Sequence, residues 1–195
     1  KELEFESSGG DVERIETLSA CPLFARLPLE ERAVLTEKCE LINYADGDVI
    51  MKDGVPSDGT AYVIHSGLVN ISSLDGKSLR VLGRGNSVGE RGALLGELRT
   101  GSLVAVGSVQ LLGFGAEIFK PIAEELGLMQ AFSRADWLLT QVAFAQLPWA
   151  TLLDLALDFQ PRELQPGEML FDYGEPGYEC YLLVSGNIEV NNQSN

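Results

Sequence analysis

The sequence is poor in the residues that build metal centres and hydrolytic active sites. His65 is the only histidine among 195 residues, and three cysteines accompany it. A single imidazole cannot supply a cluster of metal ligands, and no nucleophile, general base and orienting group occur in combination with it. We therefore expect no metal site, no cofactor and no catalytic activity in this chain.

Basic residues are scarce as well. The sequence has 14 Lys and Arg residues against 29 Asp and Glu residues, for a formal net charge of −15. A nucleic-acid-binding protein needs a basic face, which this composition does not favour. With so large an acidic charge, an anionic ligand must be held by local basic groups.

Long apolar runs are also lacking. No stretch approaches the roughly 20 residues of a membrane span, and no signal-peptide pattern opens the chain, which begins at Lys1 and is interpreted as a fragment. Cys21, Cys39 and Cys180 are odd in number and lie in apolar sequence surroundings, which is typical of buried free thiols in a reducing compartment. These features favour a cytoplasmic protein without a membrane span.

Glycine, in contrast, is abundant, with 21 residues. Glycines separate short β-prone segments in the middle of the chain, and a helical hydrophobic period precedes and follows them. The expected helices are 11–20, 28–40, one from 117 onward and 131–139, and the clearest expected strands are 62–64, 68–71, 79–82, 103–106 and 110–114. This pattern predicts an α+β fold, in which a small antiparallel β-barrel of jelly-roll type is flanked by N- and C-terminal helices.

A repeat with an offset of 120 residues divides the chain. The matching residues occur in the same order in both copies, with one residue missing late in the second copy. The matches are Phe24-Ala25, Leu27-Pro28, Leu35, Gly47, Gly54 and Pro56 with Phe144-Ala145, Leu147-Pro148, Leu155, Gly167, Gly174 and Pro176, then Tyr62 and Ser66-Gly67 with Tyr181 and Ser185-Gly186. We therefore predict a linker at 1–10, a complete domain at 11–139 and a truncated second copy of that domain at 140–195.

The stretch from Ser87 to Leu103 carries the most informative chemistry. It holds a carboxylate, Glu90, and a guanidinium, Arg99, on either side of a short apolar turn rich in glycine. Arginine can pair with a phosphate through two N–H groups at once, and a carboxylate accepts a hydrogen bond from a sugar hydroxyl. The combination predicts a ligand that carries both sugar and phosphate.

The order of helix, small barrel, G-E-(x)8-R turn and closing helices resembles the cyclic nucleotide-binding domain of cAMP- and cGMP-dependent protein kinases, certain channels and bacterial regulators. The resemblance implies that Glu90 accepts the ribose 2′-hydroxyl and that Arg99 pairs with the exocyclic phosphate oxygens. The residues that it places at the ligand are Leu79, Arg80, Gly89, Glu90, Arg91, Gly92, Ala93, Arg99, Thr100 and Gly101.

The segment L-R-V-L-G-R-G-N at 79–86 is similar to a segment of the cGMP-dependent protein kinases. The resemblance implies that Arg80 contacts the Hoogsteen edge of guanine and that Thr100 bonds the guanine amino group and the phosphate. It also implies a side chain that covers the base, for which Trp137 and Trp149 are the candidates. We therefore expect cGMP as the ligand, with cAMP as the second choice.

The resemblance thus implies a regulatory fragment, itself without enzymatic activity, of a cGMP-dependent serine/threonine protein kinase. Its expected partners are a cyclic nucleotide and a kinase catalytic region, in cis or in trans. Two alternatives stay open. One is the regulatory subunit of a cAMP-binding kinase. The other is a ligand-free interaction module, because Val88, Gly92 and Gly101 depart from the family pattern and glycine raises the ordering cost of the loop.

Overall fold

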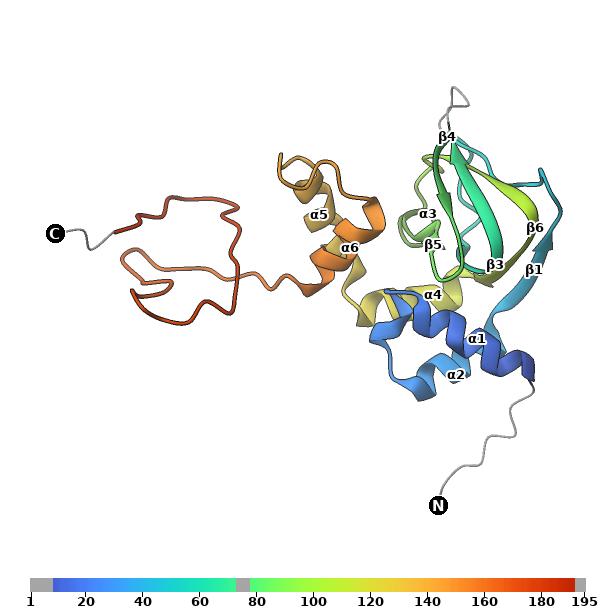
Figure 1. Cartoon of the computed structure of the whole chain (residues 1–195), viewed down its shortest axis with the longest axis horizontal. Helices are drawn as coiled ribbons and strands as arrows, with labels where there is room; N and C mark the ends of the chain where they lie inside the picture. Colours follow the sequence, from blue (N-terminus) through green and yellow to red (C-terminus); the bar gives the residue numbers. More distant parts are fainter. Residues whose placement is uncertain (1–8, 73–77, 192–195) are drawn as a thin grey trace, which may run out of the picture. The chain divides into compact units, whose positions relative to one another are not determined.

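The computed structural model describes residues 9–72 and 78–191, which fall into two compact units (Figure 1). The first unit ends at Phe159 and the second begins at Gln160. The linker predicted at 1–10 lies mostly outside the described residues, and its last two residues begin a helix. Within the described ranges, no helix is both long and apolar enough to cross a membrane.

In the described residues before the sheet there are two α-helices and a 3-10 turn. Helix α1 covers Gly9–Ala20, η1 covers Phe24–Arg26 and α2 covers Leu29–Lys38. Pro28 lies immediately before α2, where its fixed φ suits the start of a helix and its missing N–H costs no intrahelical hydrogen bond. In Figure 1, α1 and α2 lie below the sheet.

The sheet is antiparallel, and its strand order is β1-β6-β3-β4, with β2 paired to β6 and β5 paired to β3. The strands are β1 (Glu40–Tyr44), β2 (Val49–Met51), β3 (Ala61–Ser72), β4 (Ser78–Leu82), β5 (Ser87–Val88) and β6 (Ser102–Phe114). The sheet stays open instead of closing into a barrel. Together with its flanking helices it confirms the predicted α+β, jelly-roll-like class.

Strands β3 and β6 are long because each joins two of the predicted strands into one. The register between them shifts on both sides of Ser66. Next to this bulge, Gly67 has a φ of +82°, and a Cβ atom there would lie 2.3 Å from the carbonyl oxygen of Ser108. Only glycine allows the two strands to approach so closely at this point.

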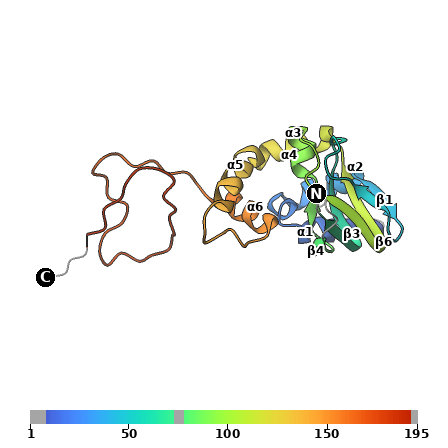
Figure 2. The same cartoon turned by 90° about the horizontal axis from the view of Figure 1, so that it is seen from above.

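Among the described residues, four helices follow β5. They are α3 (Glu90–Leu95), α4 (Ala116–Glu125), α5 (Leu128–Leu139) and α6 (Trp149–Asp158). The predicted interruption at Gly127 is confirmed, since this residue has a left-handed φ of +64° between α4 and α5. Helix α6 packs against α5, and Figure 2 shows the two helices together on one side of the first unit.

Two clusters of buried side chains form the core of the first unit. One lies among the strands and includes Tyr62 and Val69. The other, which we call the helix–sheet core, includes Phe24 and Phe114, whose rings stack with centroids 4.9 Å apart. This stacking fixes η1 against the end of β6, next to the start of α4.

Helix α6 belongs to the helix–sheet core although it lies in the second copy of the repeat. Its ten residues occupy the positions that α2 occupies 120 residues earlier. Leu152, Leu153 and Ala156 are buried in the helix–sheet core. The compact first unit therefore includes a helix from the segment predicted as the second domain.

The described part of the second unit contains turns but neither helix nor strand. Several of these turns repeat those of the first copy. The amide of Glu168 donates to the carbonyl of Gln165, as the amide of Asp48 donates to that of Ala45. The glycines at three repeated turns also share their φ values: Gly47 and Gly167 (+83° each), Gly54 and Gly174 (+74° and +84°), and Gly67 and Gly186 (+82° and +88°). The truncated second domain stays a prediction.

The three cysteines are free thiols, but they differ in exposure. Cys21 and Cys39 are buried, as expected, and burial raises the pKa of the Cys21 thiol to about 11. Cys180 lies in the second unit and is exposed, contrary to the expectation. Its apolar sequence neighbours are themselves exposed, because no strand forms there to bury them.

Candidate functional site

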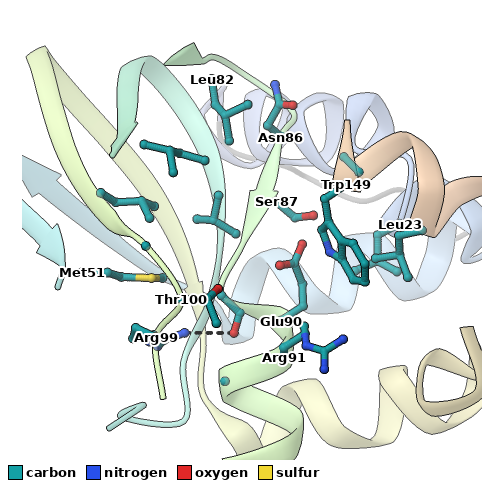
Figure 3. A pocket seen from close by; sticks show the side chains of 18 of the residues that line it. Leu23, Met51, Leu82, Asn86, Ser87, Glu90, Arg91, Arg99, Thr100 and Trp149 are labelled. Carbon is teal, nitrogen blue, oxygen red and sulfur yellow. Dashed lines mark hydrogen bonds between the residues drawn. The ribbon is translucent and has the colours of Figure 1, made fainter. Parts of the chain in front are cut away.

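A cavity of about 310 Å³ opens in the first unit, between the sheet, the α3 turn and α6 (Figure 3). Its volume is within the range of sites for small molecules. In Figure 3, Met51 and Leu82 of the sheet lie on the left, Trp149 and Leu23 lie on the right, and Glu90 lies between them. The cavity therefore joins the sheet to helical segments from both ends of the first unit.

Most of the predicted ligand-binding residues line this cavity. Those that do so are Arg80, Gly89, Glu90, Arg91, Gly92, Arg99, Thr100 and Gly101, together with the candidate cap Trp149. The same cavity is thus lined by both charged groups of the motif, Glu90 and Arg99. It is also lined by the two residues predicted to contact the base, Arg80 and Thr100, and by one of the two tryptophans.

Three predicted residues lie elsewhere. Ala93 is 3% exposed and packs in the helix–sheet core, so its side chain points away from the cavity. Leu79 is 58% exposed, because successive residues of a strand point to opposite faces and its neighbour Arg80 faces the cavity. Trp137 packs against the helix–sheet core from α5. Trp149 is therefore the candidate cap that reaches the cavity.

Two glycines make room for the guanidinium of Arg99. Gly89 adopts a left-handed φ of +84° before α3, and a Cβ atom there would lie 2.5 Å from Nη1 of Arg99 and 2.6 Å from Cε of Met51. A Cβ atom at Gly92 would lie 2.8 Å from the same Nη1 atom. The glycines of this turn therefore serve close packing around the arginine as well as backbone freedom.

The backbone at Arg99 is fixed against the loop that precedes β3. Its amide donates to the carbonyl of Val55 at 2.9 Å, and its carbonyl accepts from the amide of Gly54 at 2.8 Å. The neighbouring Leu98 forms an isolated antiparallel bridge with Pro56. These contacts hold the end of the G-E-(x)8-R turn at a defined position beside the sheet.

The Arg99 side chain is held by three hydrogen bonds within the protein. Nη1 donates to the carbonyl of Gly89 at 3.0 Å (dashed in Figure 3), and Nη2 donates to Oδ1 of Asp58 at 2.7 Å and to the carbonyl of Thr60 at 2.9 Å. A guanidinium has five N–H groups. Among the described residues, one N–H on Nε and one on Nη1 are left without a partner.

Asp58 serves as the counter-ion of Arg99. Burial raises the pKa of the Asp58 carboxyl, but the hydrogen bond from the Thr60 amide and the charge of Arg99 outweigh it, so the pKa lies below its usual range. The carboxylate is therefore ionised at neutral pH. This pairing places a negative charge directly beside the Arg99 guanidinium, whose side chain is only 6% exposed.

Glu90 is the second buried charge of the site, with 8% of its surface exposed. Burial raises the pKa of its carboxyl above the usual range, while hydrogen bonds from the Ser87 hydroxyl and its own amide act in the opposite direction. In the part of the chain that the structure describes, Glu90 forms no ion pair. A buried carboxylate without a cation is costly, so it would gain from a hydroxyl donor in the cavity.

Arg91 connects α3 to α5 and α6. Its guanidinium makes a two-point ion pair with Glu97, at 3.0 and 3.1 Å, and another with Asp136 of α5, at 3.0 and 3.2 Å. The same group lies 5.4 Å from the ring centre of Phe132 and 5.5 Å from that of Trp149. Cation–π contacts of this geometry are favourable, so Arg91 helps to place Trp149 at the cavity.

The sequence motifs missed the apolar walls and the counter-ion. Met51, Ile71, Leu82 and Leu103 line the sheet side of the cavity. Strand alternation could have identified Leu82, since it lies two residues after Arg80 on the same face. Asp58 gave no such signal, because it lies in a loop far from the motif in sequence.

His65 is not among the residues that line this cavity. Its Nδ1 atom lies 2.8 Å from Oγ1 of Thr17 in α1, and Thr17 also accepts a hydrogen bond from Nε of Arg84. Burial and the charge of Arg84 lower the pKa of His65. The residue therefore fastens α1 to the sheet.

Comparisons with known proteins find one family model and several similar proteins. Residues 41–125 match the model of the cyclic nucleotide-binding domain. The cAMP-dependent protein kinase regulatory subunit of Dictyostelium discoideum is 26% identical over 183 residues, which are 92% of this chain. The chain spans 56% of the length of that relative.

Solved structures share the fold. The regulatory domain of Toxoplasma gondii PKA with cAMP superposes with a TM-score of 0.59 at 17% identity, over 78% of this chain and 59% of that one. The regulatory subunit of a cAMP-independent protein kinase A from Trypanosoma cruzi, bound to guanosine, superposes with a TM-score of 0.66 at 20% identity, over 88% of this chain and 61% of that one. Residues 41–125 therefore resemble a cyclic nucleotide-binding domain, and the chain as a whole is similar to a regulatory subunit of cAMP-dependent protein kinase.

Proposed function

We propose that the first unit binds a cyclic purine nucleotide and that the chain is a non-catalytic, regulatory part of a protein kinase. One observation carries this proposal. Arg99 is buried and already neutralised, yet two of its N–H groups find no partner among the described residues, and it borders the same cavity as the buried carboxylate of Glu90. A phosphate and a sugar hydroxyl would satisfy these two groups together.

The proposed roles follow from the chemistry of each side chain. Arg99 donates its free N–H groups to the exocyclic phosphate oxygens, and Glu90 accepts the ribose 2′-hydroxyl. Trp149 offers an aromatic face to the base from α6. The apolar residues of the sheet contact the sugar and the base from the opposite side.

For the base we favour guanine, and therefore cGMP. Arg80 and Thr100 both border the cavity, and arginine donors suit the two adjacent acceptors on the Hoogsteen edge of guanine. The guanosine in the T. cruzi relative supports a guanine base in this fold. The alternative is cAMP. It is supported by the D. discoideum relative, which is a regulatory subunit of a cAMP-dependent kinase, and by the T. gondii structure, which contains cAMP.

Calorimetric titration of the chain with cGMP, cAMP and guanosine tests this function. We expect saturable binding of both cyclic nucleotides, tighter for cGMP, and weaker binding of guanosine because it brings no phosphate to Arg99. Binding of guanosine that matches cGMP would contradict the phosphate role of Arg99. No heat and no thermal shift at millimolar nucleotide would end the proposal.

A second candidate function is a ligand-free interaction module. The observation that favours it is the set of ion pairs that Arg91 makes with Glu97 and Asp136, together with the ion pair between Arg99 and Asp58, since all of them stabilise the turn without a ligand. In that case Arg99→Ala would change the stability of the protein, and neither the natural chain nor the variant would bind a cyclic nucleotide.

We further propose that a kinase catalytic region is the partner and that a cytoplasmic kinase is the context. The regulatory-subunit relatives support this proposal. We also retain the second domain from residue 140 onward, supported by the shared turns of the two copies. Hydrogen exchange in a longer chain that supplies the remaining strands should show protected amides between 160 and 191, and unprotected amides would contradict it.

A further inference from the structure

A single arginine fastens α6 to the turn that precedes α2. Nη2 of Arg26 in η1 donates to Oδ1 and to the carbonyl oxygen of Asp154, at 2.5 and 3.1 Å, and Nη1 donates to Oδ1 of Asp158 at 2.7 Å. We call these three residues the α6 clamp. It joins η1, near the beginning of the first unit, to the last helix of that unit.

The two aspartates of the clamp are unfavourable for α6 on its own. Residues four apart lie on the same side of a helix, so the two negative charges repel each other. They also lie in the second half of α6, where the helix dipole disfavours negative charge, and its last turn has no basic residue. Arg26 supplies the missing positive charge. Its side chain is 26% exposed, so the guanidinium keeps part of its hydration and the ion pairs carry no large desolvation penalty.

The clamp borders the proposed ligand site. Asp154 lines the cavity, as do Leu153 of α6 and Leu23, which lies just before η1. Trp149 begins the same helix and reaches the cavity from its first turn. Fixing α6 at Asp154 and Asp158 therefore also fixes the position of Trp149.

The repeat shows that the clamp is not a general feature of this helix. The counterparts of Asp154 and Asp158 in α2 are Val34 and Lys38, and the counterpart of Arg26 in the second copy is Gln146. None of the three clamp residues has a counterpart of the same charge in the other copy, so this set of charges occurs only at the contact between η1 and α6. A helix whose only task was to begin the second domain would not need them.

We propose that Arg26 is a positioning residue that, through Asp154 and Asp158, keeps Trp149 over the cavity and slows the release of a bound purine nucleotide. The proposal rests on the proposed function, because it concerns the residence time of that nucleotide. Single exposed ion pairs contribute little, but here one guanidinium meets two side chains and a carbonyl. We expect removal of the clamp to speed release about three- to tenfold, with little change in association.

The test measures dissociation of a fluorescent cGMP analogue, displaced by excess cGMP, in the complete 195-residue chain. Arg26→Gln and the pair Asp154→Asn with Asp158→Asn should each speed release, and combining all three should add nothing further. Arg26→Lys should restore part of the residence time. Arg162→Gln is the control, because it removes another ion pair, with Glu168 in the second unit, and should leave release unchanged.

A second comparison separates positioning from a general loss of stability. In a Trp149→Ala background, Arg26→Gln should no longer change the release rate, since the clamp acts through Trp149. In the ligand-free chain, Arg26→Gln should speed amide exchange across α6 and leave exchange in β3 unchanged. Equal acceleration across both elements would overturn the positioning role.

The outcomes distinguish the two proposals. If the natural chain binds cGMP or cAMP and the Arg26 variants release it at the natural rate, the clamp is overturned and the proposed function stands. If the natural chain binds no cyclic nucleotide, the proposed function fails, and the clamp fails with it as a retaining device. In both cases the exchange data on α6 still report whether Arg26 holds the helix.

Discussion

Arg99 and Asp58 form an ion pair of unequal exposure, in which 6% of the arginine side chain and 62% of the aspartate side chain are accessible. The positive partner is fixed inside the site, and the negative partner lies at its edge. Asp58 therefore compensates the charge of Arg99 without occupying the cavity, which leaves the remaining N–H groups available.

The ion pair predicts a loss of stability in acid. Because the pKa of Asp58 is lowered in the folded protein, its contribution to stability is present above the unfolded value of about 4 and is lost as the pH falls through the folded value. We expect Asp58→Asn to lower the melting temperature at pH 7 and to reduce its further fall toward pH 3. Thermal melts at several pH values measure this, and parallel curves for both proteins would contradict it.

Arg99→Ala should weaken binding of cyclic nucleotides by about 2–3 kcal/mol, roughly 30- to 150-fold, because the phosphate loses its charged donor. Arg99→Lys should recover only part of this loss, since an ammonium cannot reproduce the planar fork. Calorimetry on folded variants gives the affinities, and near-ultraviolet circular dichroism checks the fold. An unchanged affinity in Arg99→Ala would show that Arg99 does not bind the phosphate.

Glu90→Gln should raise the free energy of unfolding of the ligand-free protein by about 1 kcal/mol at pH 7 and weaken nucleotide binding. Since the folded pKa of Glu90 is raised, its ionisation costs stability as the pH rises above the unfolded value. A matched pair of ligands sharpens the test. Relative to the natural chain, the variant should lose affinity for cGMP but little for 2′-deoxy-cGMP, and equal losses would contradict the ribose role.

Thr100→Ala should narrow the preference for cGMP over cAMP, because it removes the hydroxyl proposed to bond the guanine amino group. Arg80→Gln should do so as well. The ratio of the two dissociation constants is the relevant quantity, since it cancels a general weakening of the site. A ratio that stays the same in both variants would leave the guanine preference without support from these residues.

Gly92→Ala should weaken binding about three- to tenfold although alanine suits a helix better than glycine. The new Cβ atom would lie 2.8 Å from both Nη1 of Arg99 and Oγ of Ser57. One of these side chains must move, and a shift of Arg99 misplaces the phosphate donors. Combining the change with Ser57→Gly gives the side chains room, so it should restore part of the affinity.

Features of the fold and the site that depend on residues close together in the sequence could be predicted better than features that depend on distant segments. Glu90 and Arg99 share one turn, so the sequence predicted that they act together, and the resemblance to the cyclic nucleotide-binding domain added Arg80. All three residues line the cavity. Helix α3 shows the limit of such reasoning. Gly92 and Ala93 are adjacent in sequence, yet one lines the cavity and the other lies in the helix–sheet core.

Features that depend on long-range packing were not predictable from local patterns. The contact between Arg26 and α6 and the pairing of Asp58 with Arg99 both join distant segments. The strands expected in the second copy illustrate the same dependence. In the first unit, β1 and β2 both pair with β6. The described residues of the second unit include no counterpart of β6, so the same strand-forming residues remain in turns.

The position of α6 has a consequence for how the chain can be divided. The first domain is predicted to end at residue 139, whereas the first compact unit continues to Phe159. A protein cut between α5 and α6 would expose core residues such as Ala135 and Leu138 to water. A protein truncated at the predicted domain boundary would therefore lack about 20 residues of the first compact unit, including all of α6.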